Sequence, residues 1–157
     1  MRLVRYAPAG PPAGAPRFAL VEGDGDAAEA IECSDPFAAG DGTRPTPLPG
    51  AAPVPLSSLC LLAPAAPTKV ICASGTYRAV ILSMKKEWPT EPVLFLKPST
   101  AVTGPGTDIV WPAQGVEELT HEPELAVVIS RRAKDVTVEE AASCILGYTC
   151  ANDVSAW

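Results

Sequence analysis

Histidine is nearly absent from this 157-residue sequence, since His121 is the only one, and the five cysteines form no CxxC pair. We therefore expect no zinc site of the cysteine and histidine type. The number of cysteines is odd, and most lie among apolar residues of the sequence. This pattern predicts buried, reduced thiols of a cytoplasmic protein, at positions 33, 60, 72, 144 and 150.

The sequence also lacks any run of lysine or arginine, and its net charge is −6. Nucleic acid is therefore not an expected partner. The N-terminus has no apolar core of the kind found in signal peptides. The longest uncharged segment, residues 45–68, contains seven prolines, a density that no membrane helix tolerates. We expect a linker there, a cytoplasmic location and no contact with a membrane.

Proline divides the chain, because 12 of the 18 prolines lie within residues 1–67. Residues 1–6 and 17–23 have strand-like sequences, separated by a loop rich in proline and glycine over residues 7–16. The GDGD sequence at 23–26 predicts a hairpin-like turn.

Residues 35–67 are expected to be mostly irregular, with one short apolar patch in the sequence LSSLCLL. We predict a small N-terminal domain with a proline-rich linker over residues 1–63. A second domain is predicted over residues 64–157.

The second part of the chain is dominated by apolar, β-branched segments, which predict strands. The segment TGPGTDIVWP predicts a turn leading into a short strand. The other expected strands are at residues 69–74, 92–98, 124–130 and 148–154. With a single clear helix, the predicted fold class is α+β and mostly β.

That helix is predicted over about residues 138–146. Thr137 is a good N-cap, and Glu140 follows three residues later, which is a capping box. Gly147 stands where a glycine commonly ends a helix.

Two acidic residues stand out in the sequence HEPELAVVIS, namely Glu122 and Glu124. Residues two apart on a strand point to the same face, so the two carboxylates project together and repel each other. A hard divalent cation such as Mg²⁺ removes that repulsion. Asp153, near the end of the chain, is the candidate for a third ligand. Spacing alone leaves a plainer alternative, in which both glutamates are solvated residues at a strand edge.

Four segments occur in an order and at spacings typical of one family: KVICASGTYR, EPVLFLKPSTAVTGPGTDIVWP, HEPELAVVISRRAKDV and GYTCANDVSA. Residues 68–156 thereby resemble the fumarylacetoacetate hydrolase family. The segments MRLVRY and FALVEG resemble the small N-terminal domain that many members carry. The resemblance implies the first part of a rolled, mixed β-sheet catalytic domain, and an assembly as a homodimer.

The resemblance also implies a chemistry. It places an Mg²⁺ or Mn²⁺ ion on Glu122, Glu124 and Asp153. Such an ion binds a 1,3-dicarbonyl or 2-oxo acid substrate and stabilises the enolate that leaves when a C–C bond breaks. The implied activity is that of a metal-dependent hydrolase or lyase, within a family that also contains decarboxylases and isomerases.

The chain departs from the family pattern G-x-N-Y-x-x-H-x-x-E. Aligned on Tyr77, the histidine and glutamate that activate water in the family become Val80 and Ser83, and valine carries no proton. His121 is not expected to substitute, because alternation turns it away from Glu122. Glu87, in an expected lid, is a speculative substitute base, so no catalytic residue is predicted.

Pro123 and Trp157 are further departures. Pro123 cannot donate to a sheet, so an edge strand or a bulge is expected there. Trp157 stands where the family has an arginine followed by many more residues, so we expect a partial catalytic domain whose apolar faces need another chain. Three hypotheses therefore remain: a weak or inactive enzyme, a non-catalytic module pairing with a full-length homologue, and a truncated or mis-predicted gene product.

Overall fold

The computed structural model describes residues 1–8 and 14–157. It contains two compact units, one made of Met1–Ala65 with Gly104–Trp157 and the other of Ala66–Thr103. Residues 9–13 of the expected N-terminal loop lie outside the described residues. The domain boundary expected after residue 63 stays a prediction.

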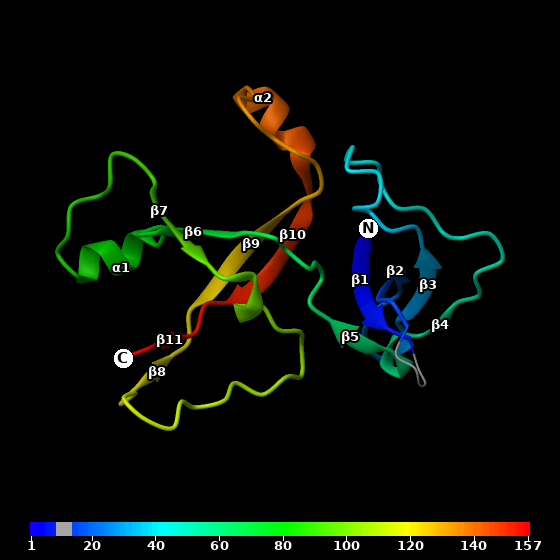
Figure 1. Cartoon of the computed structure of the whole chain (residues 1–157), viewed down its shortest axis with the longest axis horizontal. Helices are drawn as coiled ribbons and strands as arrows, with labels where there is room; N and C mark the ends of the chain where they lie inside the picture. Colours follow the sequence, from blue (N-terminus) through cyan, green and yellow to red (C-terminus); the bar gives the residue numbers. More distant parts are fainter. Residues whose placement is uncertain (9–13) are drawn as a thin grey trace. The chain divides into compact units, whose positions relative to one another are not determined.

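The N-terminal part of the first unit is a five-stranded antiparallel sheet with the order β4-β3-β2-β1-β5 (Figure 1). The two strands predicted there are confirmed as β1 and β2, and the turn after β2 joins it to β3. Gly23 and Gly25 adopt φ values of 71° and 58° in that turn, which suit glycine best. The bounds are Arg2–Ala7 for β1, Arg17–Glu22 for β2, Glu29–Cys33 for β3, Val54–Pro55 for β4 and Cys60–Leu62 for β5.

The main buried cluster lies on one face of this sheet. It contains Tyr6, Ala19, Val21, Ala28 and Ala30, with Leu56, Leu59 and Leu61 packed against it. The LSSLCLL patch therefore forms the 3₁₀ turn η2 (Leu56–Ser58) and β5, and is ordered by this packing. The rest of residues 35–67 is mostly irregular, as expected, with only β4 in addition to this patch.

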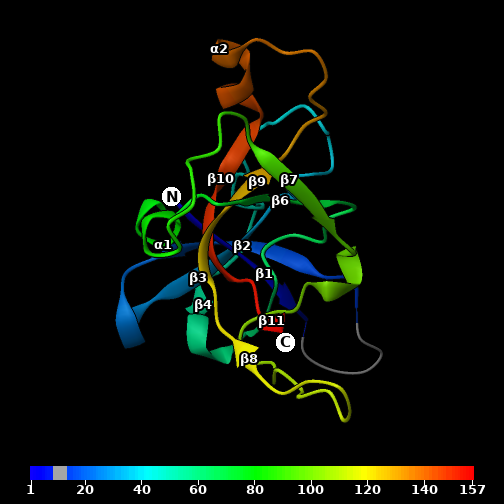
Figure 2. The same cartoon turned by 90° about the vertical axis from the view of Figure 1, so that its left-hand side faces the viewer.

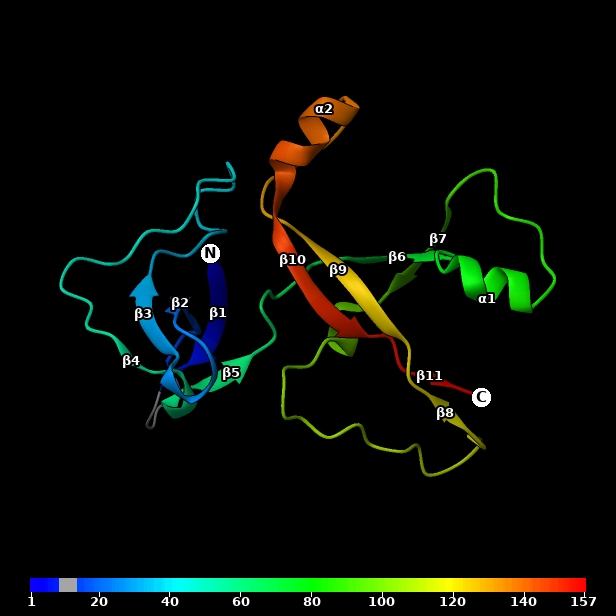
Figure 3. The same cartoon turned by 180° about the vertical axis from the view of Figure 1, so that it is seen from behind.

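The second unit is an antiparallel pair of β6 (Val70–Ser74) and β7 (Val93–Lys97), both of which were predicted. A short helix, α1 (Arg78–Ser83), follows β6 (Figure 3). It was not predicted from the sequence. A 3₁₀ turn, η3 (Ser99–Ala101), follows β7.

The last part of the chain forms a long β-hairpin. Its main strands are β9 (Pro123–Ile129) and β10 (Ile145–Asn152), and its outer strands are β8 (Leu119–Thr120) and β11 (Ser155–Ala156). Figure 2 shows β9 continuing into β8 and β10 into β11. Both pairs are antiparallel, so one pair of segments runs through two successive ladders.

The turn of this hairpin corrects the helix prediction. The capping box is confirmed, since Thr137 and Glu140 exchange both hydrogen bonds. However, α2 spans only Val138–Ala141, and a 3₁₀ turn, η4 (Ala142–Cys144), leads directly into β10. Ile145 pairs with Ile129, and the register shifts between Ile145 and Gly147. Pairing with β9 therefore overrides the local helix signal, and Gly147 lies at a bulge rather than at a helix end.

Two further expectations are corrected. Residues 107–112 form no strand, because they have no ladder partner and Pro112 lacks a backbone donor. The cysteines are all free thiols, but only Cys33 and Cys144 are buried, while Cys60 and Cys150 are exposed. No helix among the described residues is long and apolar enough to cross a membrane.

Apolar side chains are exposed on the two hairpins. On β9 the exposure alternates, and Leu125, Val127 and Ile129 occupy the exposed positions. On β6 and β7, Ile71, Leu94 and Leu96 are also largely exposed. The fold is thus mostly β, with a packed core in the N-terminal sheet and uncovered apolar strands in both hairpins.

Candidate metal centre

The candidate centre lies at the junction between the two ladders of the long hairpin. In the inner ladder Pro123 pairs with Asn152, and in the outer ladder Thr120 pairs with Ser155. Moving three residues from Pro123 to Thr120 matches moving three residues from Asn152 to Ser155, so one register continues through both ladders. It therefore places Glu122 directly opposite Asp153, although neither residue belongs to a strand.

Backbone hydrogen bonds hold this junction together. The Asp153 N–H donates to the Glu122 carbonyl over 2.9 Å. The Glu122 N–H donates to the side-chain Oδ1 of Asn152, also over 2.9 Å. Asn152 thus supplies the acceptor that the opposite backbone would otherwise provide, and the ladder remains closed between Pro123 and Thr120.

The three predicted ligands occupy one face of this ladder. Directly opposed residues of an antiparallel pair share a face, and so do residues two apart. Glu124 lies opposite Ala151, two positions from the pair of Glu122 and Asp153. All three acidic residues are half-buried, while His121 and Pro123 are exposed, which agrees with the alternation.

The carboxylates are not gathered around one point. The Ser155 Oγ–H donates to Oε1 of Glu122. Within residues 1–8 and 14–157, no group of three or more His, Cys, Asp or Glu side chains is arranged to hold a metal ion. The donor set itself suits Mg²⁺ or Mn²⁺, since it offers three hard oxygen ligands from adjoining backbone positions. The ligand assignment stays a prediction that the register supports.

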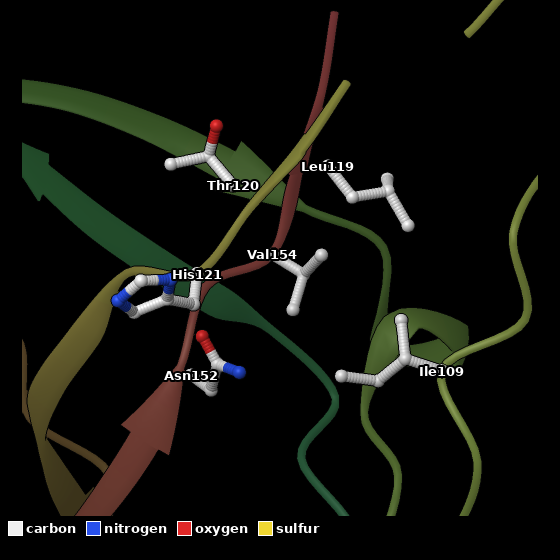
Figure 4. A pocket seen from close by; sticks show the side chains of 6 residues that line it. All are labelled: Ile109, Leu119, Thr120, His121, Asn152 and Val154. Carbon is white, nitrogen blue, oxygen red and sulfur yellow. The ribbon is translucent and has the colours of Figure 1, made fainter. Parts of the chain in front are cut away.

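A shallow pocket lies at the same junction (Figure 4). Leu119, His121, Asn152 and Val154 all occupy positions that face away from Glu122 in this register. None of the three predicted ligands lines the pocket. His121 is therefore separated from the acidic face, as the alternation predicted. The six lining residues are Ile109, Leu119, Thr120, His121, Asn152 and Val154.

Pro123 is accommodated as the first residue of β9. The first position of a strand is one of the few places where a sheet tolerates proline, because the missing N–H breaks no continuous ladder. Among the described residues, β9 is paired with β10 in a two-stranded sheet. Proline therefore separates the two acidic positions without disturbing the register.

The positions of the family's water-activating pair lie on α1. Val80 is 48% exposed, and the Ser83 hydroxyl donates to the Val80 carbonyl over 2.8 Å. The two residues are one helical turn apart and share a face. Neither side chain is a general base, and the absence of a catalytic base from this chain stays a prediction.

Two residues with a clear role at the junction were missed from the sequence. Asn152 and Ser155 both belong to the segment NDVSA, in which only Asp153 was singled out. Ser155 lies two residues after Asp153, so strand alternation could have placed it on the acidic face. The side-chain acceptor role of Asn152 depends on the break in the ladder, which has no signal in the sequence.

Comparison with known proteins assigns the family. A family model described as the C-terminal domain of fumarylacetoacetate (FAA) hydrolase matches residues 69–157. The chain belongs to the fumarylacetoacetate hydrolase family. Protein Rv2993c of Mycobacterium tuberculosis is 47% identical over 102 residues, which are 65% of this chain and 38% of that protein. The resemblance inferred from the four sequence segments is therefore confirmed.

Solved structures of the family share the fold. The 5-carboxymethyl-2-hydroxymuconate delta-isomerase of Mycobacterium smegmatis has a TM-score of 0.79 and 41% identity over 99% of this chain and 56% of its own. Maleylpyruvate hydrolase of Sphingobium sp. SYK-6, in complex with manganese(II) and pyruvate, has a TM-score of 0.67 and 27% identity over 99% of this chain and 59% of its own. The chain spans about half the length of these fumarylacetoacetate hydrolase relatives, which include an isomerase and a hydrolase.

Proposed function

We propose that this chain carries the metal-binding part of an enzyme acting on 1,3-dicarbonyl or 2-oxo acid substrates. The main support for this proposal is the common register of the two ladders, β9 with β10 and β8 with β11. It sets Glu122 opposite Asp153, with Glu124 two positions along on the same face. The manganese and pyruvate of the maleylpyruvate hydrolase complex support a divalent cation and an oxo acid as the matching ligands.

Each of the three carboxylates would supply a hard oxygen donor to Mg²⁺ or Mn²⁺. A bound ion would polarise the oxygens of an oxo acid and stabilise negative charge that develops beside a breaking C–C bond. The chain's own contribution is to hold three negative groups at fixed backbone positions. The hydrogen bond from Asp153 to Glu122 keeps two of them aligned before any ligand arrives.

Hydrolytic C–C cleavage is proposed to be weak. Breaking the bond with water needs a base that removes a proton from that water. At the positions that the family pattern gives to this pair, α1 of this chain has Val80 and Ser83, and the Ser83 hydroxyl donates to a backbone carbonyl. Decarboxylation needs no activated water, because the electron pair of the breaking C–C bond passes to the polarised oxo group, whereas isomerisation still needs a group that transfers a proton.

The test mixes purified protein with Mn²⁺ or Mg²⁺ and an acylpyruvate. The turnover rate is measured as the loss of the absorbance of the diketone. We expect slow turnover that is abolished by Glu124→Gln. Glu139→Gln, in the exposed first turn of α2, is the matched control and should leave the rate unchanged. Metal-independent turnover, or equal rates in Glu124→Gln and the wild type, would contradict the proposal.

A second candidate function is pairing with another chain, either a second copy or a full-length homologue. The observation that favours it is the exposed apolar face of β9 and β10. Leu125 is 69% exposed, and Tyr148, on β10, is 64% exposed. Light scattering after size exclusion should show a homodimer, or a complex when a homologue is added. A monodisperse monomer under both conditions excludes this candidate.

A further inference from the structure

The carboxylate of Glu122 is held from one side by a neutral hydroxyl. Ser155 Oγ–H donates to Oε1 of Glu122, and both side chains are half-buried. We propose that Ser155 is a positioning residue, which fixes the Glu122 carboxylate so that Oε2 is the oxygen offered to a divalent cation. This inference rests on the proposed function, because it concerns the same metal site.

The location of Ser155 is set by the outer ladder. Ser155 pairs with Thr120, and the common register makes it the diagonal neighbour of Glu122 on the same face. Diagonal neighbours are within reach of a long side chain such as glutamate. Because Ser155 is a short residue on a paired strand, its hydroxyl has little freedom and provides a fixed point for the longer side chain.

The backbone of Glu122 is fixed by the same short segment. Asn152 accepts from its N–H, and Asp153 donates to its carbonyl, each over 2.9 Å. Residues 152–155 thus hold Glu122 at three atoms: the amide nitrogen, the carbonyl oxygen and Oε1. Among the hydrogen bonds between described residues, those from residues 152–155 reach every polar atom of Glu122 except Oε2.

This arrangement has a chemical consequence for ion binding. A carboxylate with one oxygen occupied by a donor presents the other oxygen as a single, directed ligand. Hydrogen-bonding partners of metal ligands orient them in this way, and their loss typically weakens metal affinity by about 10- to 100-fold. The hydroxyl carries no charge, so it orients Glu122 without neutralising the acidic face.

The experiment is Mn²⁺ binding by isothermal titration calorimetry, with the same full chain and four variants. Ser155→Ala should raise the Kd about 10-fold or more, while Ser155→Thr, which retains the hydroxyl, should bind close to the wild-type affinity. Asn152→Asp, which keeps a side-chain oxygen for the Glu122 N–H, should also retain the hairpin. Ser143→Ala is the matched control, because the Ser143 hydroxyl contacts Arg131 and Glu140 but not the acidic face.

Thermal unfolding in the presence of a chelator separates positioning from folding. Ser155→Ala should have the same apo midpoint as Ser143→Ala and differ only in Mn²⁺ affinity. Wild-type protein that binds Mn²⁺ while Ser155→Ala binds equally tightly overturns this inference and leaves the proposed function standing. Wild-type protein that binds no Mn²⁺ overturns both, and loss of affinity in Ser155→Thr equal to that in Ser155→Ala also overturns the inference.

Discussion

Asp153 donates its backbone N–H to the backbone carbonyl of Glu122 over 2.9 Å, directly across an antiparallel ladder. The two residues are 31 positions apart in the sequence, yet the hairpin makes them immediate neighbours. Their carboxylates share a face with that of Glu124 by strand geometry. A hard divalent ion is the ligand that three carboxylates on one face would suit, and their gathering around such an ion stays a prediction.

Asp153→Asn should therefore weaken Mn²⁺ binding by at least about tenfold, because the amide keeps the shape of the side chain but removes a charged ligand. The measurement is calorimetric titration at fixed ionic strength. Asp108→Asn, an exposed acidic residue in the loop before β8, provides the charge-matched control. Equal weakening in both variants would point to general electrostatic attraction rather than to ligation by Asp153.

Gly104 should not tolerate a side chain. A Cβ atom at this position would lie 2.9 Å from the backbone nitrogen of Ala63 and 3.0 Å from the carbonyl carbon of Leu62, both at the end of β5. Gly104→Ala is expected to lower the free energy of unfolding by about 1–3 kcal/mol, as overpacking does.

Gly147→Ala is the matched control for that change, because a Cβ at Gly147 would meet nothing within 4 Å. We expect a change within about 0.5 kcal/mol there. Urea unfolding followed by circular dichroism measures both variants. A Gly104→Ala protein as stable as Gly147→Ala would show that the close approach to β5 does not exist in solution.

The start of α2 depends on its capping box. Thr137 accepts from the Glu140 N–H over 3.2 Å, and the Thr137 N–H donates to the Glu140 carboxylate over 2.9 Å. Thr137→Ala should lower stability by about 1 kcal/mol, whereas Thr137→Ser should change it little. The comparison of the two unfolding midpoints checks this, and identical midpoints would rule out a stabilising cap.

The thiols should differ in reactivity. Burial raises the pKa of Cys33 to about 11, so at pH 8 this thiol stays protonated, and alkylation needs the thiolate. Cys60 and Cys150 are exposed and should react first with iodoacetamide in the folded protein. Mass spectrometry of peptides after brief labelling gives the order, and labelling of Cys33 as fast as Cys60 would contradict its burial.

Labelling of Cys33 should also rise with pH, because the thiolate fraction grows as the pH approaches 11. The raised pKa of Cys33 also makes the stability of the protein depend on pH. The folded-state pKa lies above that of the unfolded chain, so the contribution of Cys33 to stability is present at neutral pH and is lost as the pH rises toward 11.

Strands with local signals were predictable from the sequence. Residues 17–23 and 124–130 combine apolar and β-branched residues, and they form β2 and β9. The capping box at Thr137 was also predictable, because all its atoms lie within four residues. The C-terminal end of α2 was not predictable, because the pairing of Ile145 with Ile129 depends on a partner strand distant in the sequence.

The helix α1, in contrast, has no local start signal in the sequence and was not predicted. Its N-cap is Tyr77, whose side chain makes no capping hydrogen bond, so the usual start signal is absent. The three acidic residues could be named from the family resemblance. Their alignment across the hairpin, and the contacts of Asn152 and Ser155 with Glu122, depend on a register that the sequence alone does not specify.

The central claim is that Glu122, Glu124 and Asp153 form a site for one divalent cation. Calorimetric titration of Mn²⁺ into the chelator-treated full chain, with Glu124→Gln alongside, tests it most directly. We predict binding of one ion per chain that is lost in Glu124→Gln while the apo unfolding midpoint is retained. An absence of binding heat in the folded wild-type protein, or unchanged binding in Glu124→Gln, would contradict the claim.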